Sequence, residues 1–106
     1  MKLIEKLLNL MGRTAHALVG VDLLLQGRVR DSERYVKDFI SITEEEIRGA
    51  FYFLIPEAQK VIIKKFKGLQ NILEDDKEIQ KNKEKVVADL GKLFSMIDTQ
   101  ISLFGY

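Results

Sequence analysis

Apolar side chains recur every three or four residues through almost the whole sequence, and no stretch alternates between apolar and polar residues as a β-strand does. A spacing of three and four matches the 3.6-residue turn of an α-helix. Pro56 is the single proline, so little interrupts the pattern. The sequence therefore predicts an all-α protein. A chain of 106 residues fits one domain, which we expect to span residues 1–106.

The pattern divides into four predicted helices, at residues 2–26, 33–54, 57–73 and 77–103. Gly27 can end the first helix in a left-handed conformation, and Ser32 can cap the second. Pro56 ends the second helix because it lacks an N–H donor. The acidic residues 74–76 favour the start of the fourth. Short connections place consecutive helices antiparallel, so we expect an up-and-down four-helix bundle.

Residues 43–46 indicate an alternative architecture. Thr43 and Glu46 form a capping-box pattern that would start a new helix at Glu44. A second stripe of apolar residues runs unbroken through Val36 and Ile47 and favours one continuous helix. The alternative is three long helices, with residues 32–42 as a short crossing piece and a kinked helix over 44–73. Residues 79–85 are nearly all polar and are expected to project into solvent.

Composition excludes several classes of chemistry. The chain has no cysteine and one histidine, which rules out disulfides, a cysteine nucleophile and a zinc site. No serine, histidine and acid arrangement is recognisable, so we expect a non-enzymatic protein with no catalytic residue, metal, cofactor or small-molecule substrate. The most apolar stretch, residues 3–25, contains four charged side chains and is too polar for a transmembrane segment. A cytoplasmic location is the expectation.

The segment from Phe51 to Ile55 consists of five consecutive large apolar residues. Successive helical residues point in all directions around the helix, so these side chains cannot all enter one core. We therefore predict partner-binding residues at Phe51, Tyr52, Phe53 and Ile55. Our leading hypothesis is a small helical-bundle protein that acts by protein–protein interaction, with another protein or as a homo-oligomer. Alternatively, Pro56 and the loops, or Phe104 and Tyr106, cover this segment.

Two basic clusters support a second hypothesis, binding to the phosphate backbone of a nucleic acid. Their residues are Lys60, Lys64 and Lys67, spaced along one helical face, and Arg28, Arg30 and Arg34. No interleaved aromatic residues accompany them, and the net charge is only +1, so local clustering would have to carry the binding.

One carboxylate is predicted to need a partner. Asp22 falls within the apolar arc of the first helix, where a lone charge is costly. We expect Arg28 or Arg30 to pair with it.

His16, the only histidine, lies on the polar side of the first helix. Glycines stand one turn away on either side, at Gly12 and Gly20, and would leave the ring unshielded. An exposed imidazole that titrates near neutrality suits reversible phosphorylation.

A short motif around this histidine supports the same hypothesis. The residues Ala15, His16, Leu18 and Gly20 resemble the Ala-His-x-Leu-Lys-Gly signature of histidine phosphotransfer domains. The resemblance covers about six residues, and Val19 stands where the family has lysine. It implies a third hypothesis, phosphotransfer through His16.

Overall fold

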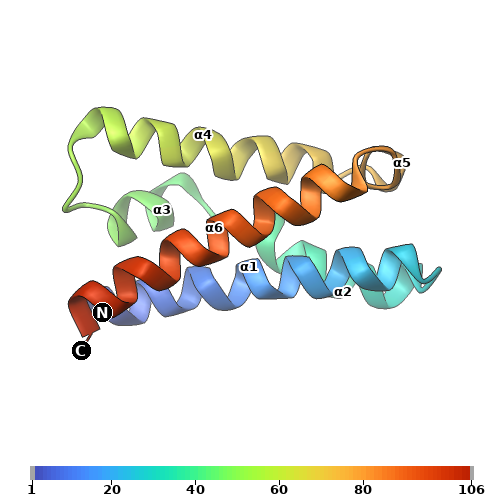
Figure 1. The fold of residues 1–106 in the computed structure, drawn as a ribbon, viewed down its shortest axis with the longest axis horizontal. Coiled ribbons are helices and arrows are strands. Elements are labelled where there is room, and N and C mark those ends of the chain that lie inside the picture. The colour runs from blue at the N-terminus through green and yellow to red at the C-terminus, as the bar shows by residue number, and fades with distance from the viewer. Residues whose placement is uncertain (1, 106) are drawn as a thin grey trace.

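The computed structural model describes residues 2–105 and contains six α-helices within them. Their bounds are α1 Leu3–Leu25, α2 Val29–Ile40, α3 Glu44–Ala50, α4 Pro56–Leu73, α5 Asp76–Lys81 and α6 Lys83–Gly105. The all-α prediction is confirmed. The longer helices α1, α2, α4 and α6 lie along the molecule, α3 sits beside α4, and α5 closes one end (Figure 1). The described residues thus contain two short helices, α3 and α5, in addition to the four helices of the predicted bundle.

The predicted first helix is confirmed with nearly the same bounds. The chain reverses after α1 in a Schellman motif: the N–H of Gly27 donates to the carbonyl of Leu24, and that of Arg28 donates to the carbonyl of Leu23, both at 2.9 Å. Gly27 has φ of 84°, which only glycine adopts readily. The prediction that Ser32 caps the second helix is wrong, because α2 already begins at Val29. Ser32 lies inside α2.

The predicted continuous helix over residues 33–54 is wrong, since α2 ends at Ile40 and α3 begins at Glu44. The capping box is present: the Thr43 side chain accepts from the Glu46 N–H, and the Glu46 carboxylate accepts from the Thr43 N–H, both at 3.1 Å. Gln70 of α4 stabilises the break. Its side-chain amide lies within hydrogen-bonding distance, 2.9–3.3 Å, of the carbonyls of Phe39 and Ile40 at the end of α2 and of Ile42 in the connection to α3.

The kinked helix over residues 44–73 of the alternative architecture is also absent. Helices α3 and α4 are separate, and Pro56 occupies the first turn of α4, where its missing N–H costs no helical hydrogen bond. Pro56 is thus the first residue of α4 and does not kink a longer helix.

Residues 79–85 are exposed as predicted at every position except Ile79 and the half-buried Asn82. They are split between α5 and α6 at Asn82, and Ile79 is buried with 1% exposure. The Asp75 side chain caps α5 by accepting from the Lys77 N–H at 2.9 Å. One apolar residue in a polar stretch is therefore enough to fold α5 back onto the core.

One continuous core runs through the molecule. Phe39 of α2 and Phe66 of α4 are fully buried and stack with their ring centroids 5.7 Å apart. Around them lie fully buried side chains of α1 and α6, including Leu7, Leu90 and Ile97. This core fixes α1, α4 and α6 relative to one another, so their exposed faces are well defined.

Candidate functional site

The connection between α3 and α4 carries most of the predicted partner-binding residues. Tyr52 and Ile55 are 66% and 67% exposed, and Phe53 is half-buried. Phe51 is fully buried, so its prediction as a partner-binding residue is wrong. Phe51 directly follows α3, and one of the five consecutive apolar side chains is thus buried within the protomer.

A hydrogen-bonded glutamine fixes the shape of this connection. The side-chain amide of Gln59 in α4 donates to the carbonyls of Phe51 and Leu54, each at 3.1 Å. The N–H of Leu54 also donates to the Phe51 carbonyl, at 3.0 Å, so backbone and side-chain donors close the same turn. Gln59 therefore holds the backbone that presents Tyr52 and Phe53.

The last turn of α6 extends the same surface. The rings of Phe53 and Phe104 pack edge to face with their centroids 4.7 Å apart, and Tyr52 packs edge to face on Phe53 at 6.2 Å. Phe104 is 50% exposed and its neighbour Leu103 is 69% exposed. The expectation that Phe104 lies against this segment is confirmed, whereas Tyr106 lies outside the described residues. We call Tyr52, Phe53, Ile55, Leu103 and Phe104 the aromatic end.

Figure 1 shows the α3–α4 connection and the C-terminal end of α6 at the same end of the molecule. Although about 50 residues apart along the chain, the two segments meet where Phe53 packs on Phe104. Leu103 and Phe104 are not among the partner-binding residues predicted from the sequence, because the contact of α6 with residues 51–55 depends on the antiparallel path of α6.

His16 has a specific partner. Its Nδ1 lies 2.6 Å from the Oδ2 of Asp38 in α2, and the Tyr35 ring meets the imidazole edge-on at 5.5 Å. The His16 and Asp38 side chains are 51% and 43% exposed. With Nδ1 engaged by the carboxylate, Nε2 is the ring nitrogen left for other chemistry.

The glycines beside His16 differ in role. Gly12 is exposed, and a Cβ there would meet no atom within 4 Å. Gly20 is buried, and a Cβ there would lie 2.5 Å from Cγ2 of Val36. The expectation that both glycines unshield the imidazole is therefore wrong for Gly20, whose lack of a side chain lets α2 approach α1.

Arg13 joins three helices close to His16. Its guanidinium donates to the Glu46 carboxylate at 2.6 Å, to the Asp38 carbonyl at 2.8 Å and to the Ser41 hydroxyl at 2.7 Å. Partial burial raises the pKa of Glu46, but the Thr43 backbone hydrogen bond and Arg13 outweigh it, so the pKa lies below the ordinary 4.5. Arg13 thus ties the capping box of α3 to α1.

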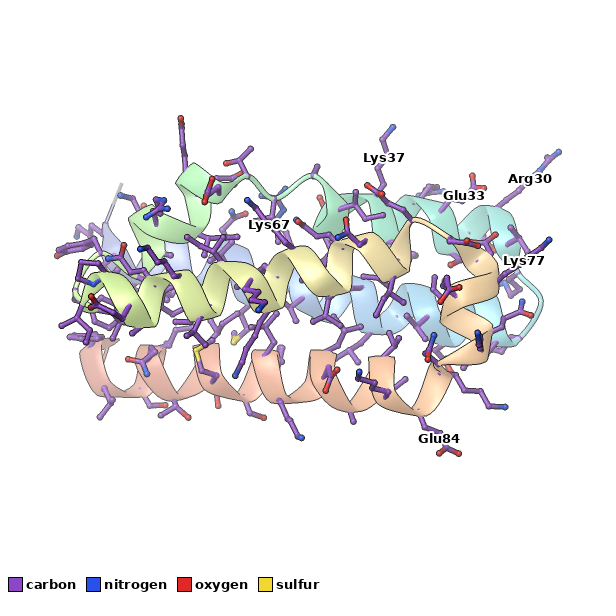
Figure 2. The ribbon with its side chains drawn as sticks, turned by 90° about the horizontal axis from the view of Figure 1, so that it is seen from above. Arg30, Glu33, Lys37, Lys67, Lys77 and Glu84 are labelled. Atoms are coloured by element: carbon purple, nitrogen blue, oxygen red, sulfur yellow. The ribbon has the colours of Figure 1, made fainter. Side chains whose placement is uncertain are left out.

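The two basic clusters lie on different parts of the surface. Figure 2 shows Arg30 at one end of the molecule and Lys67 near the middle. Arg28 pairs with Asp31 at 2.6 Å, and Lys67 lies 3.7 Å from Glu44 in α3. The structure does not bring the clusters together into one basic surface.

The predicted pairing of Asp22 with an arginine is wrong. The Asp22 side chain is exposed and its Oδ2 accepts from Gln26 at 2.8 Å. The charge is therefore solvated and needs no buried counterion.

The fold defines the class, a small all-α protein of packed helices. No family model, curated protein or solved structure matches this chain. None of the helices within residues 2–105 is long and apolar enough to cross a membrane. Over the same residues, His, Cys, Asp and Glu side chains form no group of three that could hold a metal ion. Functional inference therefore depends on the surfaces described above.

Proposed function

We propose that this chain is a non-enzymatic helical protein that acts by protein–protein interaction, and that it associates with a second copy of itself through the aromatic end. The observation that carries this proposal is the packing of the Tyr52, Phe53 and Phe104 rings on one another, with Tyr52 66% and Phe104 50% exposed; Ile55 and Leu103, near them in the sequence, are 67% and 69% exposed. Contiguous apolar surface of this kind is typical of interaction sites. Aromatic residues on it are favoured at interface hot spots.

Charge favours a second copy as the partner. Residues 51–56 and 101–105 contain no charged residue, whereas 31% of the chain is charged. In a symmetric dimer the same surface meets itself, so a charged surface would face like charges across the interface. An uncharged aromatic surface faces no such repulsion and buries its apolar area on both sides.

The test is the oligomeric state, measured by light scattering over a concentration series. We expect the wild type to form a dimer and the variants Tyr52→Lys and Leu103→Lys to stay monomeric, because each places a charge in the interface. Leu25→Lys is the matched control, because Leu25 is 43% exposed and is the last residue of α1, whose C-terminal end lies at the other end of the molecule from the aromatic end (Figure 1). Thermal melts check that all variants fold. A wild type that stays monomeric at the highest concentration, or equal dissociation in Leu25→Lys, contradicts the proposal.

Phosphotransfer through His16 is a second candidate, favoured by the contact with Asp38. The Asp38 carboxylate can accept a hydrogen bond from Nδ1–H, which orients the ring and leaves the lone pair of Nε2 to accept a phosphoryl group. Arg13 is bound to Glu46 and is therefore engaged before any phosphate arrives. Incubation with phosphorylated receiver domains should give an acid-labile adduct, lost in His16→Gln and reduced in Asp38→Asn. No adduct with any of several receivers would remove this candidate.

The nucleic-acid hypothesis and the cytoplasmic location remain predictions. Binding to an oligonucleotide through Lys60, Lys64 and Lys67 should weaken steeply as salt rises, and charge reversal at Lys60 should reduce it. The absence of binding at low salt would count against this hypothesis.

A further inference from the structure

A groove separates α4 from α6 on the surface of the molecule, with a volume of about 330 Å³. The two helices run side by side in Figure 2, and Figure 1 shows that they are closest near α5 and diverge toward the C-terminal end of α6. Leu69 of α4 and Leu93 of α6 form its floor and are buried, while Ile72 and Met96 are half-buried beside them. The volume lies at the lower end of the range for small-molecule sites, roughly 300–1,000 Å³.

The rim of the groove is strongly cationic. Lys64 and Lys65 stand on the α4 wall and Lys85 and Lys92 on the α6 wall, all of them exposed, with Asp89 as the one acidic lining residue. The lining carries a net charge of +3 on a chain whose net charge is +1, so the rest of the chain is net negative. Among residues 2–105, none of these four lysines makes an ion pair within 4 Å.

We propose that this groove binds a single-chain anionic amphiphile, an alkyl or acyl chain with a phosphate or carboxylate head. The chain would lie on the floor of Leu69 and Leu93, where burial of its methylene groups away from water is favourable. The head would sit among lysines from both walls, whose flexible stems can pack along apolar surface while the ammonium groups reach the anion. A bound anion also relieves the repulsion between neighbouring cations.

This site is separate from the aromatic end, and the inference does not depend on self-association. Sequence analysis predicts no small-molecule ligand, because the two lysine pairs stand on different helices and only the antiparallel packing of α4 against α6 makes them face one groove. Of these lysines the sequence predicts a role only for Lys64, as a nucleic-acid contact.

The experiment is calorimetric titration of the protein with dodecyl phosphate and with dodecanoate, below the concentration at which they form micelles. We expect one site per chain for one or both probes, and weaker binding at high salt. Dodecyltrimethylammonium and inorganic phosphate should bind at least about ten-fold more weakly, because one lacks the anionic head and the other the chain. Equal binding of the cationic amphiphile, or binding of many molecules per chain, would overturn the proposal.

Two glycines give matched variants. Gly68 lines the groove, and a Cβ there meets nothing within 4 Å, so the side chain of Gly68→Leu can occupy the groove without a backbone clash. Gly91 of α6 also has open space but does not line the groove. Both changes replace a helical glycine and should raise helix stability. Gly68→Leu should weaken binding by about ten-fold or more and Gly91→Leu should not, since only the former displaces the alkyl chain.

Charge reversal supplies an independent check. The double variant Lys64→Glu, Lys92→Glu should lose affinity for dodecyl phosphate and gain affinity for dodecyltrimethylammonium. Equal affinities in Gly68→Leu and Gly91→Leu would refute the site. The proposal would also be refuted if neither dodecyl phosphate nor dodecanoate bound, while an acidic helical peptide or a single-stranded oligonucleotide bound to the wild type and not to Gly68→Leu. The groove would then be a docking surface for a macromolecule.

Discussion

Gly20 sits where α2 packs on α1, and its replacement by alanine tests the packing directly. A Cβ at this position would lie 2.5 Å from Cγ2 of Val36, 3.1 Å from the Val36 nitrogen and 3.2 Å from the Ser32 carbonyl oxygen. Val36 is 5% exposed and β-branched, so it has little freedom to rotate away inside a helix. The Ser32 hydroxyl also donates to the Gly20 carbonyl at 2.7 Å, which resists separation of the helices.

The expected change follows from two opposing terms. Overpacking costs about 1–3 kcal/mol, and two backbone contacts place this site at the upper end. Alanine is favoured over glycine in a helix interior by about 1 kcal/mol. Gly20→Ala should therefore lower the free energy of unfolding by about 2 kcal/mol and the melting temperature by about 8–16 °C. Gly12→Ala, in the same helix with open space, should raise the free energy by about 1 kcal/mol.

Urea unfolding followed by far-ultraviolet circular dichroism measures both effects. In a Val36→Ala background the nearest methyl is gone, so Gly20→Ala should cost less than in the wild type, with a coupling of about 0.5–3 kcal/mol. If Gly20→Ala were as stable as Gly12→Ala, the close approach of α2 to α1 would be refuted.

Three further predictions concern the joints between helices. The pKa of Glu46 is lowered on folding, so the ionised carboxylate stabilises the fold above pH 4.5, its ordinary pKa, and this stabilisation is lost as the pH falls through the pKa of the folded state. The difference in free energy of unfolding between wild type and Glu46→Gln should therefore shrink in acid. A difference that does not change with pH would contradict this. Gln70→Ala should lower the free energy of unfolding by about 1–3 kcal/mol, because the carbonyls of Ile40 and Ile42 lose the Gln70 donor while that of Phe39 keeps the Ile42 N–H, and Gln70→Glu should be no better. Pro56→Ala should lower it by about 0.4–1 kcal/mol in urea melts through the entropy of the unfolded chain, and a stabilised variant would contradict its placement in the first turn.

Local sequence signals predicted what depends on neighbours along the chain. The apolar stripe of α1, the glycine at Gly27 and the proline at Pro56 gave the ends of α1 and the start of α4 nearly correctly. The capping box at Thr43 was visible too, but a continuing apolar stripe outweighed it. The deciding contacts, from Gln70 and Arg13, come from residues roughly 30 positions away and have no local signature.

The candidate sites divide in the same way. Exposure of Tyr52 and Ile55 follows from crowding of apolar residues in one segment, so it could be predicted. The partner of His16 could not be, because Asp38 meets it only through the packing of α2 on α1. The groove likewise depends on how α4 and α6 pack, and no stretch of either helix alone predicts it.

The two hydrogen bonds from Gln59 have a consequence for recognition. They anchor the loop before any partner arrives, so association would lose little backbone entropy, and the rings would meet the partner already arranged. Gln59→Ala should then leave the surface chemistry unchanged while slowing complex formation or shortening its lifetime. If the chain associates as proposed, a half-buried amide on α4 would set the rate at which an exposed tyrosine on the neighbouring turn binds and the time for which it stays bound.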